Sequence, residues 1–442
     1  MKRPRIFYGW VVVCAAFVSM ALAFVIWNSF SVFLVAITAD YGWSRGSVSL
    51  AFSLFTIVYG LSSPLTGIAV DRFGPRVVMP LGALLLAAGL FGASQIQDLW
   101  QLYLCYGLLS AVGVSAIGTT SNLGVLANWF NRRRGTATGI ASAGIGVGTM
   151  LLVPAAEYIT TVAGWRAAYI FLALVVALTV PAITFFFQRH RPEDMGLQPD
   201  GATASRAPGS GRPVPQMRVV DKAWAARNWT VRAAVGTRAF WLLFFGFMFS
   251  TWSHQPIMIH QVAYLSDRGF EPMLGAMLVG LVGLAASLGK VFWGWLSDRI
   301  GREGAYTLGM ACVFFGIIFL GLVTDASRES LLYAYALFFG IGYGVFSPMS
   351  SAISADLFQG RSFASIYGLL WVGSGAGSSL GPWLCAALFD ATGAYTLSFA
   401  VSLVAAVASV AAFWLAAPRK VRQVPGVAAR AQRTRQALAQ GR

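Results

Sequence analysis

Long apolar segments alternate with short polar segments along the whole chain of 442 residues. Each apolar segment is about 18 residues or longer and carries little or no charge, so each can cross the roughly 30 Å hydrocarbon core of a bilayer as a helix. The pattern therefore predicts an all-α membrane protein with twelve transmembrane helices. These helices are expected at about residues 8–37, 48–70, 77–96, 100–127, 136–160, 166–187, 238–264, 272–296, 305–324, 330–355, 362–388 and 394–417.

The composition also indicates a chain that lies mostly in lipid. Hydrophobic residues make up 57% of it and charged residues only 11%, whereas soluble globular proteins carry roughly a quarter charged residues. All four cysteines fall inside predicted helices, and no CxxC pair or His/Cys cluster has the spacing of a metal site. No nucleophile with a base partner and no phosphate-binding loop is recognisable. The sequence thus predicts no catalytic residue, no metal, no cofactor and no enzymatic activity.

The net charge of +16 raises the question of a nucleic-acid partner, and the placement of the charges answers it. One of the 32 Lys and Arg residues, Lys290, lies inside a predicted helix, and 27 lie in even-numbered loops and the two tails. This bias predicts a multi-pass inner-membrane protein with both termini in the cytoplasm. The basic tail, 418–442, is then a flank near anionic lipid, and no nucleic acid is expected. The four basic residues of the odd-numbered loops are Arg45, Arg166, Arg268 and Arg328.

A polar segment divides the chain into two parts. Residues 188–237 are rich in Pro, Gly and Arg and cannot span lipid, so we interpret them as a cytoplasmic linker. The predicted domains are an N-terminal six-helix half (1–187) and a C-terminal six-helix half (238–417). The end of the linker, AWAARNWTVRAAVGTRAFW, has the pattern of an amphipathic helix lying on the inner leaflet.

The two halves repeat each other at a fixed spacing. The sequence GIAVDRFG reappears 227 residues later as GWLSDRIG, and ANWF reappears 228 residues later as ADLF. Such internal repeats are typical of carriers built from two related halves. The glycine lets two helices approach, and the Asp can bind an Arg or a helix N-terminus. The residues of this motif are Gly67, Asp71, Arg72 and Gly74 in the first copy, and Gly294, Asp298, Arg299 and Gly301 in the second.

At these residues the chain resembles the major facilitator superfamily, whose loop signature is G-x-x-x-D-R-x-G after helices two and eight. A narrower likeness lies in WFNRRRGTATGIASAGIGVG (129–148), which resembles the monocarboxylate transporter signature. YGWVVV near the start resembles the same family's first helix, and RPEDMGLQPDG resembles bacterial members related to the oxalate/formate antiporter. The resemblance implies a transporter whose halves rock around a midplane site.

Within the 129–148 segment we expect two kinds of structural residue and no substrate contact. The basic residues are interpreted as cytoplasmic anchors and the glycines as helix-packing positions. They are Arg132, Arg133 and Arg134, and Gly139, Gly144 and Gly148.

Lys290 is the residue for which the sequence predicts a contact with substrate. A charge deep in a transmembrane helix is costly and usually faces a cavity. Lys290 lies eight residues before Asp298, hence roughly 12 Å from the end of the helix. It points away from an apolar stripe, and no carboxylate is expected at its depth, so a bound anion is a suitable counter-charge. Snorkelling to the headgroups and a structural ion pair are the alternatives. The stripe comprises Leu284, Leu288, Val291 and Trp295.

The resemblance adds to this interpretation, because monocarboxylate transporters carry an Arg at the position of Lys290, four residues before the motif glycine. The Asp that many members place one turn earlier is Ala286 here. The family's proton-symport mechanism therefore does not transfer directly, and the sequence leaves a proton, sodium or a counter-anion open as the coupling species. Other candidate substrate-binding residues are Trp27, Asn28, Asn122, His254, Tyr343 and Trp371, each of which can equally be a packing or helix-bonding residue.

These features predict a secondary active transporter, expected to be monomeric, that carries small organic anions such as monocarboxylates or short dicarboxylates by alternating access. The alternative is a drug or toxic-compound efflux antiporter of the same fold. The Gly-Pro motif of such exporters is displaced here, since Pro154 follows Gly148 by six residues, and no midplane carboxylate is visible. A receptor or scaffold would be expected to carry an added domain, and the longest loop is only the linker.

Overall fold

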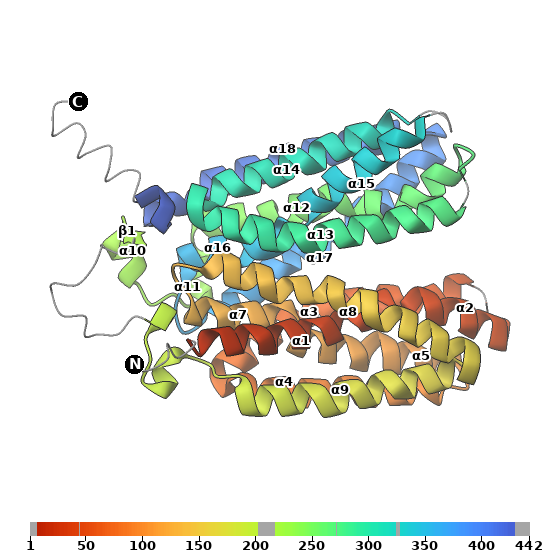
Figure 1. The fold of residues 1–442 in the computed structure, drawn as a ribbon, viewed down its shortest axis with the longest axis horizontal. Coiled ribbons are helices and arrows are strands. Elements are labelled where there is room, and N and C mark those ends of the chain that lie inside the picture. Colours follow the sequence, from red (N-terminus) through yellow and green to blue (C-terminus); the bar gives the residue numbers. More distant parts are fainter. Residues whose placement is uncertain (1–6, 44, 202–216, 271, 324–327, 429–442) are drawn as a thin grey trace, which may run out of the picture. The chain divides into compact units, whose positions relative to one another are not determined.

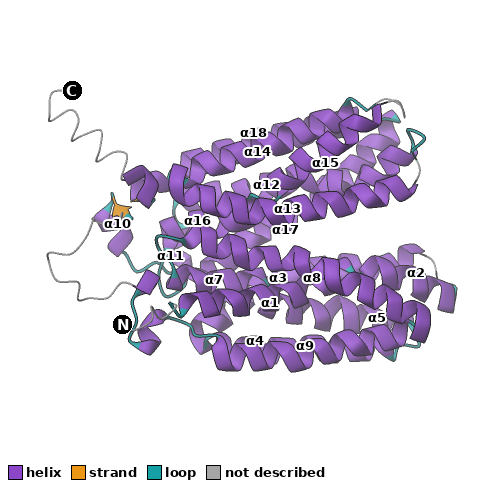
Figure 2. Ribbon diagram, in the orientation of Figure 1, coloured by secondary structure: helices purple, strands orange, loops and turns teal. Residues whose placement is uncertain are grey.

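The computed structural model describes residues 7–43, 45–201, 217–270, 272–323 and 328–428. Within these ranges the chain is almost entirely helical, with one small antiparallel sheet of two strands (Figure 2). Its contacts form two compact units. Unit 1 contains residues 1–129, 141–202 and 362–372, and unit 2 contains residues 130–140, 203–361 and 373–442. The predicted domain boundaries at the linker stay a prediction, because each unit includes a short segment from the other half of the sequence.

Unit 1 contains the first six predicted spans and the start of the eleventh. The helix α4 lies along α9, and α3 packs against α6 and α7 (Figure 1). Its elements are α1 (Gly9–Asn28), α2 (Phe30–Tyr41), α3 (Arg45–Phe73), α4 (Pro75–Ser94), α5 (Leu99–Leu102), η1 (Tyr103–Ser110), α6 (Ala111–Ile117), α7 (Thr119–Trp129), most of α8 (Arg134–Ala163), α9 (Trp165–Phe187), η2 (Pro192–Met195), η3 (Pro199–Gly201) and the first turns of α17 (Phe363–Thr392).

Unit 2 contains the remaining spans together with the linker and the start of the tail. The helix α12 lies along α18, and α15 packs between α13 and α14. Its elements are the first turns of α8, β1 (Arg218–Val219), α10 (Lys222–Ala226), α11 (Val231–Val235), α12 (Arg238–Ser266), α13 (Pro272–Ile300), α14 (Arg302–Gly321), α15 (Glu329–Tyr343), α16 (Phe346–Phe358), the rest of α17, α18 (Thr396–Ala416), α19 (Pro418–Val421) and β2 (Arg422–Gln423).

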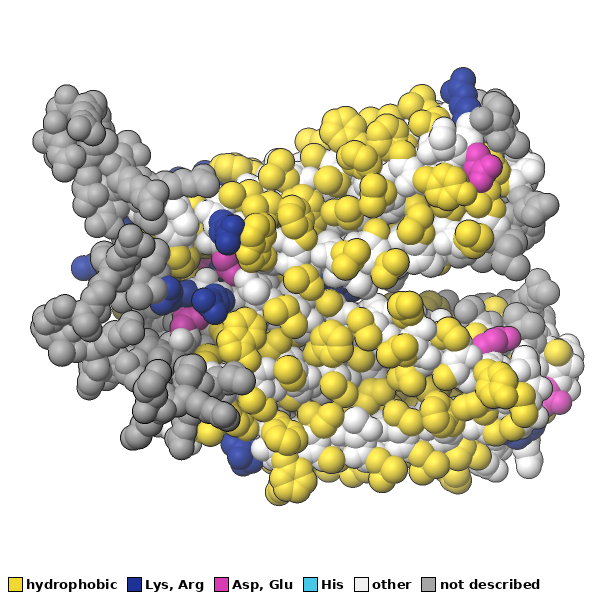
Figure 3. Space-filling model, in the orientation of Figure 1, with side chains coloured by type: hydrophobic (Ala, Val, Ile, Leu, Met, Phe, Trp, Pro, Cys, Tyr) yellow, Lys and Arg dark blue, Asp and Glu magenta, His cyan; other side chains and the backbone are white. Residues whose placement is uncertain are grey.

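The described residues confirm the twelve predicted spans. Ten of these are long and apolar enough to cross a membrane by length and composition. The other two, α12 and α17, have 29 and 30 residues and carry more polar or small residues. Large apolar side chains cover the flanks of the helices, and charged ones gather near their ends (Figure 3). This distribution is the one that a bilayer requires.

The last glycine of each motif copy is required by the backbone. Gly74 has φ 78° and Gly301 has φ 108°, and each directly precedes the next helix, α4 or α14. Only glycine adopts such angles without strain. The motif therefore ends on the residue that reverses the chain between two antiparallel helices.

The end of the linker does not form the predicted amphipathic helix on a membrane surface. It forms two short helices, α10 and α11, separated by residues 227–230. Trp229 is 1% exposed, and its ring packs edge-to-face on Phe358 of α16 with centroids 5.2 Å apart. The sequence predicts these tryptophans at headgroup depth, but Trp224 and Trp229 pack against Phe358 of α16 within unit 2 instead.

Candidate functional site

In unit 1 the motif aspartate holds the start of α17. The Asp71 carboxylate accepts hydrogen bonds from the backbone N–H of Ala364 at 3.3 Å, and from the N–H and hydroxyl of Ser365 at 2.8 and 2.6 Å. These N–H groups belong to a helix N-terminus, which attracts negative charge. Gly67 makes room for the contact, because a Cβ there would lie 2.8 Å from the Ala364 carbonyl carbon.

In unit 2 the second aspartate makes the equivalent contact with the start of α8. Asp298 accepts from the backbone N–H of Gly135 at 3.2 Å, and from the N–H and hydroxyl of Thr136 at 3.0 and 2.8 Å. It also binds Arg302 at 2.5 Å. Gly294 allows this approach, since a Cβ there would lie 2.9 Å from the Gly135 carbonyl carbon. The geometry is what the motif predicts, while its role in conformational change stays a prediction.

A buried ion network extends the contact in unit 2. Arg134 of α8 binds one oxygen of Asp356 at 2.6 Å, and Arg302 of α14 binds the other at 3.2 Å. All three side chains are at most 2% exposed. The interpretation of Arg134 as a surface anchor is therefore wrong, because its guanidinium is enclosed by protein and paired with a carboxylate 222 residues away.

The three glycines of the same segment have the packing role that was predicted. Gly139 lies against the backbone of Lys290, and a Cβ on it would lie 3.2 Å from the Lys290 carbonyl carbon. Gly144 lies against Phe17, and Gly148 lies against Ala21. Each allows α8 to approach another helix at backbone distance.

Lys290 lies in the interior of unit 2. Its side chain is 7% exposed, and among the described residues no carboxylate oxygen lies within 4 Å of it. The backbone of its turn is packed against Gly139 of α8 and against Gly344, which follows α15. The apolar stripe of the same helix is exposed, as expected for a surface that faces lipid: Leu284 50%, Leu288 65%, Val291 37% and Trp295 40%.

In unit 2, Gly344 packs on the backbone of Lys290, and its neighbour Tyr343 is in ring contact with His254. Their rings meet edge-to-face with centroids 4.7 Å apart. His254 is 4% exposed, and in the described part of the chain neither of its ring nitrogens has a hydrogen-bond partner. Tyr343 ends α15, and the Trp293 side chain of α13 donates to the carbonyl of Ile341 at 2.8 Å. The structure thus brings three predicted residues from α12, α13 and α15 into one region.

The four candidates in unit 1 occupy structural contacts. Trp27 packs edge-to-face on Phe52, Phe55 and Tyr59, with centroids 5.4 to 5.7 Å apart. Asn28 donates to the Thr149 hydroxyl at 2.8 Å. These contacts neither require nor exclude substrate binding.

Asn122 and Trp371 likewise have packing or backbone partners. The Asn122 amide donates to the carbonyls of Ile117 and Gly118 at 2.7 and 3.0 Å, where the helix breaks between α6 and α7. Trp371 packs edge-to-face on Tyr367. Their predicted contact with substrate, like that of Trp27 and Asn28, stays a prediction.

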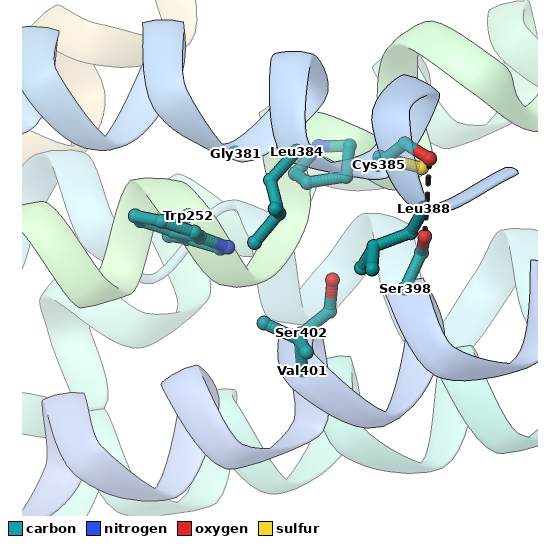
Figure 4. Close-up of a pocket in the computed structure, with 9 residues that line it drawn as sticks. Trp252, Gly381, Leu384, Cys385, Leu388, Ser398, Val401 and Ser402 are labelled. Carbon is teal, nitrogen blue, oxygen red and sulfur yellow. Dashed lines mark hydrogen bonds between the residues drawn. The ribbon is translucent and has the colours of Figure 1, made fainter. Parts of the chain in front are cut away.

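A crevice between α12, α17 and α18 differs in character from the Lys290 region. Trp252, Leu384, Cys385 and Val401 line it, and its polar side-chain groups include the Trp252 indole, the Cys385 thiol and the hydroxyls of Ser398 and Ser402 (Figure 4). The Ser398 hydroxyl there donates to the Cys385 carbonyl at 3.3 Å. Among the described residues that line it no side chain is charged, so this crevice offers an anion no counter-charge.

Comparison with known proteins places the chain in a family. The sequence profile of the Major Facilitator Superfamily matches residues 16–327 and, in a second match, residues 264–440. Monocarboxylate transporter 13 of Bos taurus is 28% identical over 396 residues, covering 89% of this chain and 86% of that protein. An uncharacterised transporter of this superfamily type from Bacillus subtilis is 25% identical over 386 residues, covering 85% and 87%.

A solved structure agrees at the level of the fold. The human organic anion transporter MFSD10 superposes with a TM-score of 0.67 at 15% identity, covering 94% of this chain and 100% of that one. The motif, the helices and the family match together identify this chain as a transporter of the Major Facilitator Superfamily, and not an enzyme.

Proposed function

We propose that this protein is a secondary active transporter of small organic anions, monocarboxylates or short dicarboxylates, that works by alternating access in a bacterial inner membrane. The observation that carries the proposal is the buried ammonium of Lys290, which has no carboxylate partner among the described residues. Removing an ion from water costs several kcal/mol unless a counter-charge replaces the lost solvation. A carboxylate substrate supplies that counter-charge when it binds.

His254 and Tyr343 supply the polar groups for the rest of the anion. A buried imidazole that lacks hydrogen bonds costs roughly 1–3 kcal/mol for each unsatisfied group, and a second oxygen on the substrate removes part of that cost. Tyr343 precedes Gly344, which packs on the backbone of Lys290, and the His254 ring packs on the Tyr343 ring. The monocarboxylate transporter relatives support the same substrate class. An efflux antiporter for cationic compounds is less consistent with a lysine in this position.

Lys290 variants test the proposal directly. Purified protein in proteoliposomes is assayed for uptake of radiolabelled lactate, pyruvate, oxalate and succinate, and thermal shifts are recorded with the same four anions. Lys290→Ala and Lys290→Glu are expected to abolish both uptake and ligand-induced stabilisation, whereas Lys290→Arg keeps the charge and retains part of both.

Arg232→Ala is the matched control, since it removes an exposed basic side chain of α11 in the same unit. It should transport like the wild type. Undiminished uptake of an anion by Lys290→Ala in correctly inserted protein would rule out the anion site.

A further inference from the structure

The end of α16 is completed by two segments that are distant in the sequence. A helix leaves its last four carbonyl groups without partners in the helix itself. Here the Trp224 side chain donates to the carbonyl of Leu357 at 2.7 Å. Arg422 donates to the carbonyls of Ala355 and Asp356 at 2.9 and 3.3 Å. The linker and the tail therefore both cap α16.

These two segments are joined to each other. Strand β1 pairs with β2, so that Arg218 lies opposite Gln423 and Val219 lies opposite Arg422. The N–H of Val220 also donates to the carbonyl of Val421 at 2.9 Å. We call residues 217–229 together with 418–428 the clasp. Figure 1 shows β1 and α10 beyond the end of α16.

The clasp also touches the ends of α13 and α14. Arg419 pairs with Glu303 at 3.3 Å. Gly426 lies against the end of α13, because a Cβ on it would lie 2.7 Å from the Arg299 carbonyl carbon. The clasp thus contacts the ends of three helices in unit 2, namely α13, α14 and α16.

The clasp and the buried ion network share one residue. The carbonyl of Asp356 accepts from Arg422 of the clasp, and its carboxylate binds Arg134 of α8 and Arg302 of α14. The repeat places Asn128 at the position of Asp356 and Pro75 at the position of Arg302. These two charges of the ion network therefore have no counterpart in the first half of the sequence.

We propose that Trp224 and Arg422 are positioning residues for the gate at the start of α8. By gate we mean the contacts of Arg134, Gly135 and Thr136 with α13, α14 and α16. The clasp holds the end of α16 so that the Asp356 carboxylate stays in register for Arg134. This inference rests on the proposed alternating access, in which such contacts must break and re-form at one end of the helices.

A cysteine at Thr138 reports on the gate without any substrate. Thr138 is fully buried in the first turns of α8, and it lies within 3.4 Å of the Pro348 carbonyl of α16. Thr138→Cys is introduced after the four native cysteines are replaced by serine, and the rate of labelling by a water-soluble maleimide is measured in purified full-length protein.

Loosening the clasp should speed the labelling. Arg422→Ala and Trp224→Phe are each expected to raise the rate about tenfold, the order expected from loss of one charge-assisted or buried hydrogen bond. Arg422→Lys keeps a charged donor, so its labelling rate should lie between that of the wild type and that of Arg422→Ala. Arg218→Ala is the matched control, because it removes an exposed arginine of the same strand pair and should leave the rate unchanged.

A disulfide in the clasp provides the opposite perturbation and leaves Arg422 and Trp224 in place. Arg218→Cys with Gln423→Cys joins residues that face each other across the strand pair, at a spacing that a disulfide can bridge. Oxidation should slow labelling of the Thr138 cysteine relative to the reduced protein, measured on the peptide that contains residue 138, because the reduced clasp cysteines also react with the maleimide. Equal rates in the oxidised and reduced forms, or a wild-type rate in folded Arg422→Ala and Trp224→Phe, would overturn the proposal. Because no substrate is used, either result is independent of the Lys290 variants.

Discussion

Replacing Asp356 by Asn should cost far more stability than the small change in shape suggests. Its carboxylate binds Arg134 at 2.6 Å and Arg302 at 3.2 Å in a fully buried site. Breaking a buried ion pair on one side costs about 3–5 kcal/mol, because the remaining charge has neither water nor counter-charge. Each arginine keeps a second contact here, Arg302 with Asp298 at 2.5 Å and Arg134 with Asn131 at 3.0 Å. We therefore expect a loss of about 3 kcal/mol, at the lower end of that range.

The assay is reversible unfolding of the purified protein in mixed micelles with increasing denaturing detergent. Asp267→Asn is the control, since it changes an exposed carboxyl group in the same unit. The double variant Arg134→Met with Asp356→Leu removes charges on both sides and should recover much of the loss. If Asp356→Asn unfolds at the wild-type midpoint, or if the effects at Arg134 and Asp356 are simply additive, the network does not stabilise the protein as argued.

Two further predictions concern the motif and the substrate site. Gly67→Val should lower the melting temperature markedly because the side chain meets the backbone of Ala364, whereas Gly60→Val in the same helix has open space and should unfold like the wild type; equal melting temperatures would contradict the packing role of Gly67. His254→Phe should raise the KM for lactate about tenfold and leave the fold intact, as judged by the melting temperature, because the substrate loses one buried hydrogen bond; an unchanged KM in uptake assays would exclude contact with His254.

The spans were predictable because hydrophobicity alone determines which segments enter lipid. The breaks inside three of them were not. At Gly118 the backbone leaves the helix with φ −88° and ψ −147°, and Asn122 compensates by bonding two carbonyls. The sequence shows that a polar side chain such as Asn122 lies in an apolar helix, and so that it has some role. Whether it binds backbone or substrate depends on the residues around it in the folded protein.

The sequence predicted those site features that depend on the pattern of a single helix. It did not predict the features that depend on contacts between segments distant in the sequence. The position of Lys290 opposite its apolar stripe follows from helical periodicity. The burial of Arg134 depends on its ion pair with Asp356. Hydropathy places Asp356 near a helix end, and no local pattern in the sequence connects it with Arg134. One signal was present in the sequence: Asp356 departs from the Asn128 of the first repeat. A charge that appears in only one copy of a repeat is a reason to look for a partner.

The motif contacts have a consequence for the order of synthesis. Asp71 is made 294 residues before Ser365. At a synthesis rate of about 5 to 20 residues per second, its carboxylate therefore has no such partner for roughly 15 to 60 seconds. Asp298 follows Thr136 by 162 residues and can bind a partner that already exists. The nascent chain therefore completes its second copy of the motif before its first, and unit 1 reaches its final contacts only when the eleventh span has left the ribosome.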